Sequence, residues 1–235
     1  MTLFAALKIL DIGNSKDEVI IPNMTFTATS NAIIYAGAKP VFVDIDPETL
    51  QIDTDQIEFA ITGNTKAIMP VHLYGHACDI EKIMEIAQKH NLKVIEDAAQ
   101  AVGATFKGKN VGTFGEFGSF SFFGNKNMTT GEGGMLITQN EELSKKALLF
   151  KNHGRSQRGT YIHEDIGLNC CITEMQAAVG LSQLEKFQRI KSKKLELVSY
   201  YKQELSHIPQ IKFQTQHIMS DSVPWFTNIF VPNAE

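Results

Sequence analysis

Short apolar segments alternate with helical segments between residues 19 and 151, and this alternation limits the possible folds more than any other feature. The expected strands cover residues 19–22, 40–45, 67–73 and 93–97, with two or three further short strands before residue 137. The expected helices cover residues 27–36, 53–61, 79–90 and 141–151. Short apolar strands that alternate with helices predict an α/β fold, a mostly parallel sheet flanked by helices on both faces.

The two ends of the sequence do not follow this alternation. The first ten residues are apolar, but Lys8 interrupts them and no basic segment precedes them, so we expect an amphipathic helix rather than a signal peptide. A long helical pattern covers residues 174–205. Residues 208–213 and 224–232 read as strands of another unit. We therefore expect a large domain over residues 1–205 and the start of a small C-terminal domain over residues 206–235.

Composition weighs against several classes of function. A net charge of -4 gives no electrostatic reason to expect nucleic acid or an anionic membrane as partner. No apolar run approaches the roughly 20 residues of a membrane-spanning helix. The three cysteines, Cys78, Cys170 and Cys171, cannot form a disulfide framework, so we expect a reducing, cytoplasmic compartment. His72 and His76 flank a strand end and a turn, and we expect no metal site there.

Two of the expected strands lead to a charged side chain. Residues 94–97 end at the carboxylate of Asp97, and the apolar run from residue 117 leads to Lys126 and a glycine-rich loop. Ligands of parallel α/β sheets bind beyond the carboxyl ends of the strands. A pyridoxal-phosphate enzyme needs a lysine that forms a Schiff base and an aspartate that keeps the pyridine nitrogen protonated. The sequence therefore predicts such a site; a surface lysine and a helix-capping aspartate are the alternatives.

Three neighbouring side chains are further candidates for binding this cofactor. Gln100, three residues after Asp97, can donate to its phenolic oxygen. Ser121 lies in the strand before Lys126 and can bond a phosphate, or it can simply face solvent. Phe26 lies in a hydroxyl-rich helix start, where it can stack on a pyridine ring or belong to the core.

Seven segments, in this order along nearly the whole chain, resemble the DegT-type nucleotide-sugar aminotransferases, and perosamine synthase-like members most. They are residues 22–31, 70–75, 96–100, 119–126, 130–134, 151–154 and 167–169. The resemblance implies the large domain of an aspartate-aminotransferase-type fold and pyridoxal 5'-phosphate as cofactor. It also implies glutamate as amino donor, a nucleotide-linked 4-keto-6-deoxy sugar as acceptor, a role in polysaccharide biosynthesis and a homodimer with shared active sites.

The resemblance also implies a role for each candidate residue. Lys126 would form the Schiff base and later move a proton between C4′ of the cofactor and the amino-bearing carbon. Asp97 would pair with the pyridine nitrogen. The other implied contacts are Gln100 to the phenolic oxygen, Phe26 to the ring face, Ser121 to the phosphate, and Asn169 to the phosphate of the neighbouring subunit.

The chain departs from the family pattern at three places. Cys171 stands where the family's Gly-x-Asn-x-Arg loop carries arginine. The family's phosphate-binding Gly-Thr pair is not in the sequence, nor is most of the small C-terminal domain, so we expect the central part of such an enzyme. These departures leave a second interpretation open, a non-catalytic remnant or subunit. A third interpretation, a sugar dehydratase of the same fold, is disfavoured because those relatives carry histidine in place of the lysine.

Overall fold

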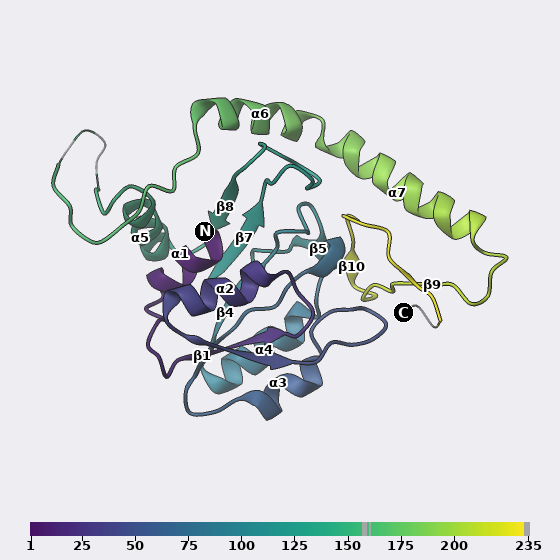
Figure 1. Cartoon of the computed structure of the whole chain (residues 1–235), viewed down its shortest axis with the longest axis horizontal. Helices are drawn as coiled ribbons and strands as arrows, with labels where there is room; N and C mark the ends of the chain where they lie inside the picture. Colours follow the sequence, from purple (N-terminus) through teal and green to yellow (C-terminus); the bar gives the residue numbers. More distant parts are fainter. Residues whose placement is uncertain (157–158, 160, 233–235) are drawn as a thin grey trace.

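A six-stranded sheet forms the centre of the molecule (Figure 1). The computed structural model describes residues 1–156, 159 and 161–232. The strands lie in the order β2-β1-β3-β4-β7-β8, all parallel except β8, which is antiparallel to β7. Their bounds are β1 Glu18–Pro22, β2 Lys39–Val43, β3 Thr65–Ile68, β4 Lys93–Asp97, β7 Phe117–Ser121 and β8 Gly134–Ile137. The predicted mostly parallel α/β sheet is confirmed.

Helices cover both faces of this sheet. One face carries α1 (Thr2–Ile9), α2 (Thr27–Ala36) and α5 (Glu141–Lys151), and the other carries α3 (Thr54–Ala60) and α4 (Ile80–His90). Side chains of β1 alternate between the two cores, because Val19 and Ile21 pack with α1 and α2 while Ile20 packs with α4. The central strands are therefore buried on both sides, which explains their continuous apolar character.

Local signals set several helix ends where the sequence predicts them. The carboxylate of Asp79 accepts a hydrogen bond from Lys82 N (3.2 Å) and caps α4, which ends at Asn91 in the left-handed conformation. The first residues form α1, as expected. Gly37 ends α2 with a φ of 100°, a conformation that favours glycine.

Other elements differ from the expectation. The helical region at 174–205 is two helices, α6 (Glu174–Glu185) and α7 (Phe187–Glu204), separated at Lys186. The strand expected over residues 67–73 is the shorter β3, and a single helical turn, η1 (Leu73–Gly75), follows it. Two-residue strands β5 (Thr105–Phe106) and β6 (Lys109–Asn110) precede β7. Among the described residues, no helix combines the length and apolar character that crossing a bilayer requires.

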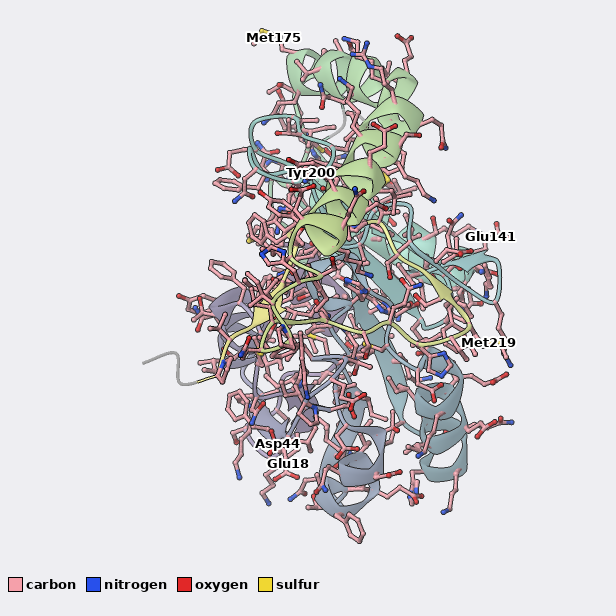
Figure 2. All side chains as sticks on the ribbon, turned by 90° about the vertical axis from the view of Figure 1, so that its right-hand side faces the viewer. Glu18, Asp44, Glu141, Met175, Tyr200 and Met219 are labelled. Carbon is pink, nitrogen blue, oxygen red and sulfur yellow. The ribbon has the colours of Figure 1, made fainter. Side chains whose placement is uncertain are left out.

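The chain after α6 runs outside the sheet and then returns to it. Figure 1 shows α6 and α7 along the upper edge of the molecule, and Figure 2 shows Met175 and Tyr200, on these helices, well above Glu18 of β1. β9 (Lys212–Phe213) pairs with β11 (Ile229–Phe230), whereas β10 (Ser220–Asp221) pairs with β5 of the preceding part. The domain division at residue 205 stays a prediction, and residues 233–235 of the predicted second unit lie outside the described residues.

Candidate active site

A cavity of about 1700 Å³ opens beyond the carboxyl ends of β4 and β7. This volume exceeds the ~300–1000 Å³ of most small-molecule sites, so it can accommodate a cofactor together with a substrate. All the candidate residues from the sequence line this one cavity: Phe26, Asp97, Gln100, Ser121, Lys126 and Asn169. The fold thus brings together, around one cavity, side chains that lie far apart in sequence.

Asp97, the last residue of β4, is a buried carboxylate at the cavity wall. Its Oδ2 accepts a hydrogen bond from the Thr29 hydroxyl (2.8 Å), and its Oδ1 accepts one from Ala99 N (3.2 Å). No helix begins at Asp97, so it is not a helix cap. Burial raises the pKa of Asp97, and the hydrogen bond from Thr29 opposes this rise. A cationic partner in the cavity would offset this cost of burial and favour the charged carboxylate.

Lys126 lies in a turn five residues after the end of β7, and its side chain is half-buried. Burial lowers the pKa of Lys126, and the charge of Asp97 opposes this shift. Within the described chain, Nζ has no hydrogen-bond or ion-pair partner; it lies 3.7 Å from the ring centroid of Trp225. An amine with a lowered pKa is more often neutral, and the neutral form is the one that attacks an aldehyde.

Gln100 presents its amide nitrogen to the cavity because its oxygen is already engaged. Oε1 accepts a hydrogen bond from Tyr74 N (2.7 Å), and Nε2 has no hydrogen-bond partner among the described residues. Tyr74 makes this contact from a strained backbone, with a φ of 58°. Sequence reasoning did not single out Tyr74; the adjacent Gly75 marks only a turn.

The other three candidates lie at more exposed positions. The Phe26 side chain, just before α2, is 70% exposed, so its interpretation as a core residue is wrong. The Ser121 hydroxyl accepts a hydrogen bond from Phe123 N (3.3 Å) and keeps its own proton for another acceptor. Asn169 is exposed, and its backbone forms an isolated bridge with Asn152. The roles assigned to these three residues stay predictions.

His72 is buried and does not line the cavity, although it follows β3. Its Nδ1 accepts a hydrogen bond from Cys78 N (3.1 Å), and its Nε2 bonds Glu96 Oε2 (3.0 Å). Both ring nitrogens are therefore occupied by protein partners, which leaves no lone pair for a metal ion.

Glu96 directly precedes Asp97 on β4, so its side chain points to the opposite face of the sheet. Besides His72, three backbone N–H groups donate to its carboxylate, those of Gly112, Phe114 and Gly115. Burial works to raise the pKa of Glu96, but the hydrogen bond from His72 and these backbone bonds outweigh it and hold the pKa below its ordinary value. This network fixes the end of β4, and with it the position of Asp97.

The charge pattern of the cavity fits pyridoxal phosphate. A buried carboxylate can pair with a protonated pyridine nitrogen, and the unengaged amine of Lys126 on the same cavity can attack an aldehyde. Residues that sequence reasoning missed also form this wall. Thr29 belongs to the hydroxyl-rich helix start, but its bond to Asp97 joins residues 68 positions apart. Trp225 carried no local signal, since it lies 100 residues from Asn125, whose carbonyl accepts its indole N–H.

Comparison with known proteins gives consistent matches along the chain. The model of the DegT/DnrJ/EryC1/StrS aminotransferase family matches residues 1–235. GDP-perosamine synthase of Escherichia coli O157:H7 is 46% identical over 235 residues, which cover 100% of this chain and 64% of that protein. GDP-perosamine synthase of Caulobacter vibrioides is 44% identical over 222 residues, covering 92% of this chain and 60% of that protein.

Solved structures give the same result for the fold. DesV of S. venezuelae superposes with a TM-score of 0.93 at 35% identity and covers 99% of this chain and 62% of its own. An aminotransferase from Psychrobacter cryohalolentis gives a TM-score of 0.89 at 37% identity, with 95% and 61% covered. The chain thus spans 60–64% of the length of these four proteins.

Proposed function

Because the chain belongs to the DegT/DnrJ/EryC1/StrS aminotransferase family, we propose that it transfers an amino group from glutamate to a nucleotide-linked 4-keto-6-deoxy sugar. Two relatives named GDP-perosamine synthase support an amino sugar as product. A relative in Bacillus subtilis named spore coat polysaccharide biosynthesis protein SpsC supports polysaccharide biosynthesis as its use. The observation that carries the proposal is that a half-buried amine, Lys126, and a buried carboxylate, Asp97, line one cavity.

The cavity residues divide the binding of pyridoxal phosphate among them. When bound, this cofactor supplies an aldehyde that takes up amino groups and a ring that withdraws electrons from the reacting carbon. Lys126 Nζ would hold it covalently, and the Asp97 carboxylate would hold a proton on its pyridine nitrogen. Gln100 Nε2 would donate to its phenolic oxygen. Phe26 would cover the ring, while Ser121 and Asn169 would bind the phosphate.

Lys126 would also carry the proton during the transfer of the amino group. Its lowered pKa makes the neutral amine available as a base, and the same nitrogen can return the proton to a neighbouring carbon. Since the amino donor and the sugar would use the same cavity in turn, the kinetics should be ping-pong.

The proposal also covers the location, the assembly and the domain organisation of the protein. Cys78, Cys170 and Cys171 are all free thiols, which supports a cytoplasmic location. We propose a homodimer in which Asn169 reaches the neighbouring subunit's cofactor phosphate, and a large domain over residues 1–205 followed by the start of a small one. Cys171, which lines the cavity where the family carries arginine, favours the second candidate, a non-catalytic member of the family.

The experiment that tests the proposal traps the cofactor on its lysine. The purified chain is incubated with pyridoxal phosphate, reduced with borohydride and digested, and the peptides are mapped by mass spectrometry. We expect a new visible absorbance band before reduction and a pyridoxyl group on Lys126 after it, both absent from Lys126→Ala. A wild-type chain without the label at Lys126 would support the non-catalytic member. A labelled chain justifies turnover assays with glutamate and nucleotide-linked keto sugars.

A further inference from the structure

Trp225 lies against the Lys126 loop, although it follows that loop by about 100 positions in the sequence. The indole Nε1 donates a hydrogen bond to Asn125 O (2.8 Å), and the Lys126 Nζ lies 3.7 Å from the ring centroid. One ring therefore holds the backbone next to the lysine by its edge and contacts the amine by its face. Trp225 also lines the cavity.

The backbone around Trp225 is fixed from several sides. Its N–H donates to Tyr74 O (2.9 Å), and its carbonyl accepts from Lys194 Nζ of α7 (3.0 Å). Two residues earlier, Val223 N donates to Gly75 O (3.0 Å), and the Val223 carbonyl accepts from Asn127 Nδ2 (3.2 Å). These bonds hold the Trp225 backbone beside the Lys126 loop, and the bond from the indole N–H to Asn125 O sets the direction of the ring, so the contact is a built part of the site.

The face of an indole attracts a cation and is indifferent to a neutral amine. Its π-electron density favours the ammonium form of Lys126, as does the carboxylate of Asp97. Three other charged residues lie near this amine. Glu132 and Lys151 line the same cavity, and Lys194 Nζ donates a hydrogen bond to the Trp225 carbonyl. Burial acts in the opposite direction and favours the neutral amine.

We propose that Trp225 is a positioning residue for Lys126: its indole face holds the free ammonium at one place in the cavity wall, and the hold ends when the amine becomes neutral and reacts. The inference rests on the proposed function for the reaction of Lys126, but the contact itself does not depend on any cofactor. It assigns to the segment after α7 a direct part in the chemistry of the large-domain lysine.

The first test measures the pH dependence of Lys126 acetylation by mass spectrometry, without pyridoxal phosphate and with exposed Lys16 as internal reference. In Trp225→Leu, which keeps an apolar cover, we expect the midpoint to move to lower pH by about 0.5–1 unit. Trp225→Phe, which keeps an aromatic face, should move it less. Phe59→Leu, at an exposed ring that does not line the cavity, should leave it unchanged. An unmoved midpoint in Trp225→Leu, or one at higher pH, overturns the proposal, because burial alone would then explain the contact.

A second measurement needs no change at Trp225. It is the only tryptophan in the sequence, so the intrinsic fluorescence of the chain reports on this one ring. We expect the emission of the wild-type chain to change as Lys126 titrates, and Lys126→Met to lose that change. Identical pH profiles in the two proteins would contradict the contact. Because neither measurement involves the cofactor, failure of the borohydride label and failure of this inference are separate results.

Discussion

Asp97 and Lys126 show how burial produces opposite effects on an acid and a base at one cavity. The pKa of the carboxyl rises and the pKa of the amine falls, because burial disfavours the charged form of each. The family cofactor would relieve the cost at Asp97 by supplying a cationic partner. Both residues could be found from the sequence, because each follows an apolar strand and therefore lies at the edge where ligands of such sheets bind.

Replacement of Asp97 distinguishes the stability that is lost by burying its carboxylate from its proposed role in binding the cofactor. Since the folded pKa of Asp97 is raised, its protonated form stabilises the fold at low pH, and this contribution is lost as pH rises through the folded pKa. We expect Asp97→Asn to raise the Tm of the cofactor-free chain at pH 7 by about 2–4 °C, and the gain to shrink at pH 4. Thermal scans at both pH values measure this.

Adding pyridoxal phosphate should reverse the order of the two proteins. A ligand that binds only the folded state raises Tm, and we expect this rise in the wild type but not in Asp97→Asn. If both proteins gain equally from the cofactor, Asp97 does not contact its pyridine nitrogen.

At the scale of elements, the end of β4 is held by a network that local sequence patterns do not reveal. The pattern of α4 was sufficient to place that helix, because its cap and apolar face lie within twelve residues from Asp79 to His90. The partners of Glu96 come instead from His72 and from the loop at residues 112–115. The return of residues 222–226 was likewise unpredictable, because hydrogen bonds to residues distant in sequence, Tyr74, Gly75 and Asn127, hold it. The break at Lys186 was not predicted either; Phe187, which follows it, is buried in the core.

Removal of the charge of Glu96 should weaken this network. In Glu96→Gln, the amide NH₂ would face other donors, so we expect a loss of about 2–3 kcal/mol in the free energy of unfolding at pH 7. Since the folded pKa of Glu96 is lowered, its carboxylate stabilises the fold above the unfolded value of about 4.3, and this is lost as pH falls through the folded pKa. Urea denaturation should therefore show a difference that narrows below about pH 4. Glu185→Gln, at an exposed residue, is the control, and an equal loss there would contradict this view.

The turn at Gly75 should also be sensitive to substitution, with a similar loss in the free energy of unfolding. Its φ is 90°, and a Cβ there would collide with the carbonyl oxygen of Val223. We expect Gly75→Ala to cost about 2–3 kcal/mol and to make the chain after α7 accessible to protease. Gly63→Ala, where a Cβ meets no atom within 4 Å, should stay within about 0.5 kcal/mol of the wild type. Equal protease resistance in both variants would show that residues 222–226 are not held by this turn.

At the scale of the whole molecule, large apolar side chains on the outer helices remain exposed. Met175 and Leu181 of α6 are 79% and 65% exposed, and Tyr200 of α7 is 58% exposed. Exposed apolar surface of this kind is typical of interfaces. It supports the proposed homodimer, although the sequence pattern gives no indication of which surface would be covered.

A mixing experiment tests whether the subunits share their sites. If Asn169 serves the neighbouring subunit, a dimer of one Lys126→Ala chain and one Asn169→Ala chain has one site without either change. Random pairing in equal amounts then restores about a quarter of the wild-type cofactor sites. Borohydride labelling of co-expressed, differently tagged chains counts these sites. No recovery over the separate variants would mean that Asn169 acts within its own chain, or that no dimer forms.

The return of the chain to the Lys126 loop has a consequence for how the protein is made. Trp225 is synthesised about 100 residues after Asn125, to which it donates a hydrogen bond. At ~5–20 residues per second, the ribosome adds this segment about 5–20 s later. The nascent chain can assemble its parallel sheet during that interval. The cavity around Lys126, however, still lacks the Trp225 side chain. Maturation of the site is therefore tied to the synthesis of the segment that carries Trp225 rather than to the folding of the sheet.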